Sequence, residues 1–253
     1  MLSIQVKEIT FANIEAIIFD KDGTLEDSRD FLRNLAQKRS RLIDAQIPGI
    51  GEPLLMAFGV EDNILNPEGL IAVASRQENL IAAAAYIAET GRGWLKSLEI
   101  ARHAFDEADW VLNRTIASSL FSGSLEVLKT LSQTGLKLGI LSADSTAGVQ
   151  AFVQHHQLNS YFQLQMGVDS NVSKPDPALF LQGCDRLGVA AAHTLMVGDA
   201  PGDMQMAAQA GSAGCIGIAW HQTRIIAGAD VMICDLQELT QHLSNPTVKV
   251  SPI

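Results

Sequence analysis

The stretch Ile17-Ile18-Phe19-Asp20-Lys21-Asp22-Gly23-Thr24-Leu25 decides the fold of this chain. The apolar run 16–19 predicts a buried strand, which ends abruptly in two acids, a glycine and a threonine. Residues two apart share a face of an ideal strand, so Asp20 and Asp22 would repel each other unless a divalent cation relieved the charge. Asp-Gly is also a common turn signal, so the stretch alone leaves a ligand site and a plain hairpin turn as equal alternatives.

The remainder of the chain outside residues 27–115 alternates strands with helices. An edge strand is expected over residues 3–11, and the predicted core strands are 14–19, 136–141, 162–166, 194–197, 215–219 and 231–233. Amphipathic or capped helical segments separate most of them. Alternation of this kind indicates βαβ units and a mostly parallel sheet.

Residues 27–115 differ from this pattern because they contain no convincing strand. We therefore expect an α/β core made of residues 1–26 and 116–253, with residues 27–115 inserted as a helical domain that holds its own small core. Arg76, Arg92 and Trp94 are its candidates for contact with a substrate carboxylate or ring. Surface arginines and a packed indole are the favoured interpretation of these three residues.

Composition limits the class of function. The 253 residues are 47% hydrophobic, and the formal net charge of −10 argues against a general nucleic-acid or anionic-membrane partner. Three widely spaced cysteines and the absence of a signal-peptide pattern favour a reducing cytoplasm. No apolar run reaches the ~18 residues of a membrane span. Both a monomer and a homodimer remain open.

Polar residues form four signals, and three of them close predicted core strands. They are Asp20 and Asp22, Ser142, Lys174, and Asp199 with Asp203. Strand ends of a parallel sheet share one edge, so four carboxylates, a hydroxyl and an ammonium would meet there. Phosphoryl transfer requires such a set: a nucleophile, Mg²⁺ ligands, cations and hydroxyls for the phosphoryl oxygens, and an acid/base. Taken singly, each residue is more simply a cap, turn or surface residue.

The set resembles the phosphatase branch of the haloacid dehalogenase (HAD) superfamily. The first motif, DxDGT, is Asp20 to Thr24, and the second motif, an apolar strand, ends at Ser142. The third is Lys174, in a Lys-Pro-Asp-Pro context common in phosphoglycolate phosphatase-like members, and the fourth, GDxxxD, is 198–203. The resemblance covers 14–26 and 121–239. It implies a three-layer, doubly wound α/β core with an all-helical C1 cap inserted between the first and second motifs, at 27–115.

The resemblance also implies a role for each position. Asp20 would be the nucleophile and a Mg²⁺ ligand, and Asp22 the general acid/base that binds the metal through its backbone carbonyl. Asp199 would be the third metal ligand, and Asp203 would orient the metal shell or Lys174. The phosphoryl group would be bound by Ser142 and Lys174, with backbone N–H groups near Gly23 and Ala143. Ala143 departs from the Asn or Gly of many members, and the role of Asp144 stays open. Lys21 is expected to point away from the metal.

These roles predict a magnesium-dependent phosphatase that hydrolyses a small phosphorylated metabolite through an aspartyl phosphate. By resemblance, 2-phosphoglycolate is the first candidate substrate. A phosphomutase would keep all four motifs and remains an alternative, as does a non-catalytic binding or regulatory module. The intact Asp22 argues against a metal-independent dehalogenase and against phosphonate cleavage.

Overall fold

A computed structural model describes residues 2–112, 118–169, 172–220 and 224–244. The expected insert boundary at Thr115 and the tail beyond Ser244 lie outside these residues. The chain divides into two compact units, Met1–Glu26 with Leu120–Ile253, and Asp27–Ser119. Each unit is described by itself below.

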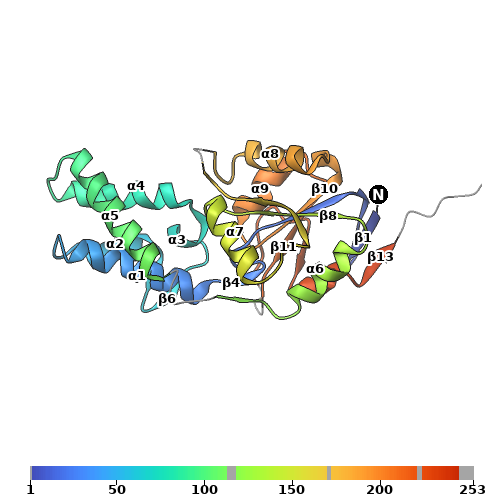
Figure 1. Cartoon of the computed structure of the whole chain (residues 1–253), viewed down its shortest axis with the longest axis horizontal. Coiled ribbons are helices and arrows are strands. Elements are labelled where there is room, and N and C mark those ends of the chain that lie inside the picture. Colours follow the sequence, from blue (N-terminus) through green and yellow to red (C-terminus); the bar gives the residue numbers. More distant parts are fainter. Residues whose placement is uncertain (1, 113–117, 170–171, 221–223, 245–253) are drawn as a thin grey trace, which may run out of the picture. The chain divides into compact units, whose positions relative to one another are not determined.

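The first unit is built on a six-stranded sheet in which all neighbouring strands are parallel (Figure 1). Its order is β12-β11-β10-β3-β8-β9. The strands are β3 (Ala16–Phe19), β8 (Lys137–Leu141), β9 (Phe162–Met166), β10 (Thr194–Gly198), β11 (Gly214–Ile218) and β12 (Val231–Ile233). The α/β class and the parallel sheet predicted from sequence are therefore confirmed.

Helices cover both faces of this sheet. Ile17 and Phe19 of β3 belong to one apolar core, whereas Ile18 belongs to another, because successive side chains of a strand point to opposite faces. The first core includes α6 (Ser124–Ser132) and α7 (Thr146–His155), and the second includes α8 (Pro177–Leu187) and α9 (Pro201–Gln209). The result is the expected three-layer arrangement, in which β3 is buried on both sides.

The N-terminal segment differs from the prediction. Instead of one strand over 3–11 it forms a hairpin of β1 (Leu2–Val6) and β2 (Ile9–Ile14), and β13 (His242–Ser244) pairs with β1. Lys7, with φ +53°, begins a two-residue turn that pairs Val6 with Ile9. Apolar alternation continues through such a turn, which is why the sequence pattern resembled a single strand.

The second unit consists mainly of helices: α1 (Arg29–Asp44), α2 (Gly51–Ala57), α3 (Leu70–Val73), α4 (Arg76–Glu89) and α5 (Trp94–Leu112). They enclose an apolar cluster of their own, which includes Leu54, Phe58 and Phe105. The expectation of no strand in this span was wrong in one detail. A short hairpin joins β5 (Val60–Glu61) to β6 (Ile64–Leu65), because Asp62 and Asn63 adopt positive φ and close a tight turn.

Short elements complete the described chain. Strands β4 (Glu26–Asp27) and β7 (Ser119–Leu120) pair in a two-stranded sheet, and 3₁₀ turns occur at Ala191–His193 and Leu236–Leu239. Within the described residues, no helix combines the length and the apolar character that crossing a membrane would require.

Candidate active site

The site begins where β3 ends. Phe19 pairs with Val197 on one side and with Ile140 on the other, so β3 lies between β10 and β8. The backbone N–H of Asp20 then donates to the carbonyl of Val197 at 2.8 Å. The residues that follow these three strands consequently meet at one edge of the sheet, as the sequence predicted for a parallel core.

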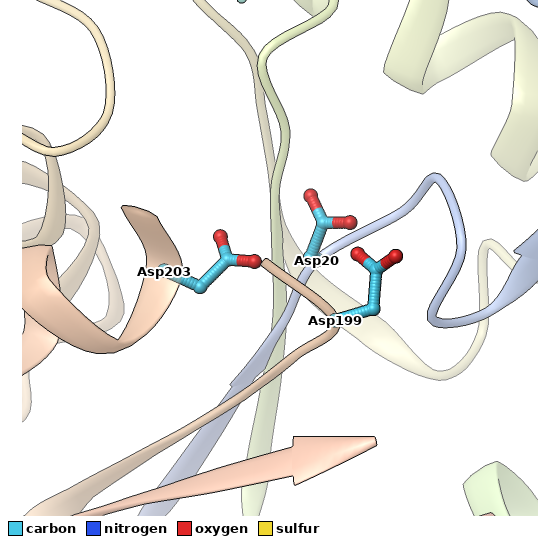
Figure 2. A group of neighbouring side chains, drawn as sticks. All are labelled: Asp20, Asp199 and Asp203. Atoms are coloured by element: carbon cyan, nitrogen blue, oxygen red, sulfur yellow. The ribbon is translucent and has the colours of Figure 1, made fainter. Parts of the chain in front are cut away.

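Three carboxylates gather at this edge. Asp20, Asp199 and Asp203 each offer an oxygen within 4.8 Å of the others (Figure 2). Asp199 directly follows β10, and Asp203 belongs to the first turn of α9 and is fully buried. From sequence, Asp203 was expected to orient the metal shell or Lys174, and its carboxylate lies in the same group as Asp20 and Asp199. The carboxylate of Asp22 lies outside this group.

The three acids are crowded and poorly solvated. Burial, together with the nearby charges of Asp203 and Asp22, raises the pKa of Asp20 to about 7 although Lys174 opposes the shift. Burial and the charges of Asp20 and Asp203 also raise the pKa of Asp199. In the absence of a cation, the site therefore disfavours full ionisation of its carboxylates.

Lys174 lies between two of these acids. Its Nζ is 2.5 Å from Oδ1 of Asp20 and 2.6 Å from Oδ1 of Asp203, with all three side chains buried. Burial alone would lower the pKa of Lys174, but the two carboxylates outweigh it and raise the pKa above its usual value. The lysine stays charged, and it supplies the positive charge that a phosphoryl group would need at this point.

The turn after Asp20 approaches Asp199 closely. Gly23 has φ +77°, and a Cβ at this position would lie 2.2 Å from Oδ2 of Asp199. Only glycine fits there, for conformational and for steric reasons. The carbonyl of Thr24 accepts a hydrogen bond from Nε1 of Trp220 at 3.1 Å, and Trp220 stacks on Phe121. The turn is thus held from a distant part of the chain.

The second predicted motif lies beside Asp22. Ser142 is fully buried, its Oγ accepts the N–H of Asp144 at 3.1 Å, and it lies 3.5 Å from Oδ2 of Asp22. Ala143 is half-buried next to it. Asp144 accepts the N–H of Ser145 at 2.6 Å with one oxygen and faces Lys21 with the other.

Two further residues had no assigned role from sequence. Lys21 is buried against Asp22, Glu26 and Asp144 rather than exposed. Arg224 is close enough to lower the pKa of Asp199 against the effect of burial and the neighbouring acids. Arg224 was not identifiable as functional because it belongs to no strand end. The sequence around Lys21 does not reveal that Glu26 and Asp144 join Asp22 around its ammonium.

The donor set fits a hard divalent cation. All the gathered ligands are carboxylate oxygens, which Mg²⁺ prefers, and burial raises the pKa of Asp20 and of Asp199, so a bound cation would favour their ionised forms. Soft thiol or imidazole ligands are absent from this carboxylate group in the described structure. The set is typical of an oxygen-ligated metal centre.

Comparisons with known proteins agree with this geometry. The family model described as haloacid dehalogenase-like hydrolase matches residues 14–211. The chain is 31% identical over 230 residues to a probable phosphatase IndB of Dickeya dadantii, covering 86% of this chain and 87% of that protein. It is 29% identical to a phosphoglycolate phosphatase of Yersinia pestis, covering 95% and 98%. The crystal structure of a predicted phosphoglycolate phosphatase from Haemophilus somnus superposes with a TM-score of 0.66 at 22% identity, covering 91% and 99%.

Proposed function

The chain belongs to the haloacid dehalogenase-like hydrolases as a phosphatase of that family, and from this we propose that it hydrolyses a small phosphorylated metabolite of the cytoplasm through an aspartyl phosphate on Asp20. The observation that carries the proposal is the placement of Asp20. Its carboxylate follows the central strand, contacts the ammonium of Lys174 at 2.5 Å and faces two further acids. The proposed nucleophile, the proposed phosphate-binding cation and two further carboxylates that could bind a metal thus lie close together.

In the first step, an oxygen of Asp20 attacks phosphorus and the bond to the ester oxygen breaks. The departing alkoxide needs a proton, and we assign its delivery to Asp22, two residues from the nucleophile. In the second step, water attacks the aspartyl phosphate, Asp22 takes the proton of that water, and the bond between phosphorus and Asp20 breaks. Asp20 and the acid/base are thereby restored.

The phosphoryl oxygens require donors throughout both steps. We assign this task to Lys174, to the hydroxyl of Ser142 and to backbone N–H groups near Gly23 and Ala143. Asp20, Asp199 and the backbone carbonyl of Asp22 would hold Mg²⁺, with Asp203 beside them. When bound, the ion neutralises the charge that accumulates between the carboxylates and the phosphate.

The substrate proposal rests on the curated relatives. The Yersinia pestis relative, aligned over 95% of this chain, is a phosphoglycolate phosphatase, so we propose 2-phosphoglycolate as the substrate. Initial rates with a panel of phosphomonoesters test this choice. The proposal requires the highest kcat/KM for 2-phosphoglycolate, and a value ~100-fold higher for another metabolite contradicts it.

The catalytic proposal is tested by Asp20→Asn. We expect a loss of several orders of magnitude in kcat, with an unchanged circular dichroism spectrum, because no aspartyl phosphate can form. The control is Asp185→Asn, which removes an exposed carboxylate from α8 and should keep normal activity. Phosphate release with and without excess chelator tests the metal. Full activity in folded Asp20→Asn, or in chelator, would refute the corresponding part of the proposal.

A further inference from the structure

Two buried lysines divide the acids of this site into two groups. Lys174 contacts Asp20 and Asp203, which lie in the metal-binding group. Lys21 contacts Asp22, Glu26 and Asp144, which lie outside that group. The proposed nucleophile and the proposed acid/base are therefore each paired with a different ammonium.

The contact between Lys21 and Asp22 involves both carboxylate oxygens. Nζ of Lys21 is 3.0 Å from Oδ1 and 2.9 Å from Oδ2 of Asp22. It also lies 3.2 Å from Oε2 of Glu26 and 3.4 Å from Oδ2 of Asp144. An ammonium that faces both oxygens restricts rotation of the Asp22 side chain, so the contact orients the carboxylate as well as neutralising it.

Lys21 itself is held from several sides. Its carbonyl accepts the N–H groups of Leu25 and Glu26, both at 3.0 Å, which fixes the backbone in the turn. Its side chain is only 7% exposed, and Nζ lies 5.8 Å from the centroid of the Phe152 ring. The ammonium has three N–H groups, donates to Asp22 and Glu26, and faces Asp144 as well, so protein carboxylates surround it. This arrangement suits a residue that positions a carboxylate rather than one that binds phosphate.

We propose that Lys21 is a positioning residue that holds the Asp22 carboxylate ready to accept the proton of the water that hydrolyses the aspartyl phosphate. The inference rests on the proposed function, because the role of Asp22 belongs to it. Contact of the ammonium with both oxygens fixes the orientation in which this carboxylate can meet the water of the second step. Glu26 and Asp144 contact the same ammonium at 3.2 and 3.4 Å.

The two steps can be separated with p-nitrophenyl phosphate. Its leaving group departs without a proton, so kcat/KM reports attack by Asp20, whereas kcat includes hydrolysis of the aspartyl phosphate. For Lys21→Met we expect kcat to fall ~100-fold while kcat/KM stays within about threefold, since acid–base assistance contributes factors of this size. Rapid mixing should show a burst of p-nitrophenolate equal to the enzyme concentration, and acid-quenched protein should carry a phosphoryl group on Asp20.

A purely structural role gives a different result. Loss of folded protein lowers kcat and kcat/KM by the same factor and produces no burst. If Lys21→Met does not fold because Glu26 loses its ammonium partner, the double variant Lys21→Met/Glu26→Gln removes both charges and is measured instead. Lys137→Met removes a lysine that begins the neighbouring strand β8 and donates to the carbonyl of Leu187, and it should show no burst.

Coupling to Asp22 completes the test. Asp22→Asn should show the same burst, and adding Lys21→Met to it should change kcat by less than about twofold, because both changes remove the same function. If Lys21→Met lowers kcat and kcat/KM equally while Asp22→Asn still shows a burst, this inference is overturned and the proposed function stands. A wild-type chain that hydrolyses no phosphomonoester would overturn both.

Discussion

Nζ of Lys174 lies 2.5 Å from Oδ1 of Asp20, although 154 positions separate the two residues in the chain. The contact connects the loop before α8 with the end of the central strand. It gives the buried carboxylate a cation where burial and two neighbouring acids all favour its neutral form. The charge state of Asp20 therefore depends on a residue that is remote in sequence.

Replacement of this lysine by Lys174→Met should lower kcat/KM at least ~100-fold, because the phosphoryl group loses a buried cation that is aimed at it. It should also lower the melting temperature, because Asp20 and Asp203 then face each other without compensation. Phosphate-release kinetics and thermal unfolding measure the two effects. Lys129→Met, on the exposed face of α6, is the matched control, and equal kcat/KM values for the two variants would contradict the assignment.

The raised pKa of Asp20 predicts how stability depends on pH in the metal-free protein. Between the unfolded value of 3.8 and the folded value of about 7, the folded state holds a proton that the unfolded state lacks. The contribution of Asp20 to the free energy of unfolding therefore falls as pH rises through that window and is constant above it. The pKa of Lys174 is raised from 10.5, so its contribution does not change below that pH.

We expect wild-type protein in chelator to gain more stability than Asp20→Asn when pH is lowered from 8 to 5. Glu26, whose pKa burial raises to about 7, contributes with the same sign in both proteins and cancels in the comparison. Melting temperatures of both proteins at the two pH values give the difference. The same pH response in wild type and variant would show that Asp20 is already ionised in the folded state.

The parallel core could be predicted because its signals are local. Buried runs such as 16–19 end in polar residues, and parallel strands bring those ends to one edge whatever the loops do. The gathering of Asp20 with Asp199 follows from this rule. The N-terminal hairpin could not be predicted, because Lys7 is an unusual residue for positive φ and only its backbone reveals the turn.

The sequence pattern predicts where strands end better than it predicts which side chains contact each other. Lys21 contacts Asp22 and Glu26 of its own segment, but its third acid, Asp144, comes from another βα unit. The contact of Trp220 with Thr24 likewise joins residues 196 positions apart. Such pairs follow from packing in three dimensions, so a pattern within one segment carries no information about them.

Gly23 offers a test of close packing at the site. In Gly23→Ala the new Cβ would lie 2.2 Å from Oδ2 and 2.6 Å from Cγ of Asp199, so the carboxylate must move. We expect magnesium affinity and kcat/KM to fall at least tenfold, as for other losses in the shell around a metal. Calorimetric titration with Mg²⁺ and phosphate-release kinetics measure these quantities.

Gly135→Ala is the control for Gly23→Ala. Gly135 has φ +83°, close to the +77° of Gly23, but a Cβ there meets nothing within 4 Å. Both variants share the cost of a left-handed alanine, about 1 kcal/mol, whereas only Gly23→Ala displaces Asp199. Equal magnesium affinity in the two variants would mean that Asp199 is not a ligand or can move without loss.

For Arg76, the sequence allowed contact with a substrate but favoured a surface arginine. Its Nε lies 2.8 Å from Oδ2 of Asp109 and its Nη2 lies 2.7 Å from Oδ1 of Asp106. Nη2 of Arg39 contacts the other oxygen of Asp109 at 2.8 Å, and both guanidinium groups lie over the ring of Phe105. Arg76 thus closes an ion-pair network between α4, α1 and α5, which favours the structural role.

Arg76→Ala should therefore lower the melting temperature by about 2–4 °C, which corresponds to about 1 kcal/mol for a partly exposed network. Lys96→Ala, which breaks an exposed pair with Glu99 on α5, should cause almost no change. Because the folded fraction cancels in a ratio, the kcat/KM for 2-phosphoglycolate divided by that for p-nitrophenyl phosphate should stay at the wild-type value in both variants. A selective loss with 2-phosphoglycolate in Arg76→Ala alone would instead show that this guanidinium recognises the substrate, and that its contacts with Asp106 and Asp109 give way when substrate binds.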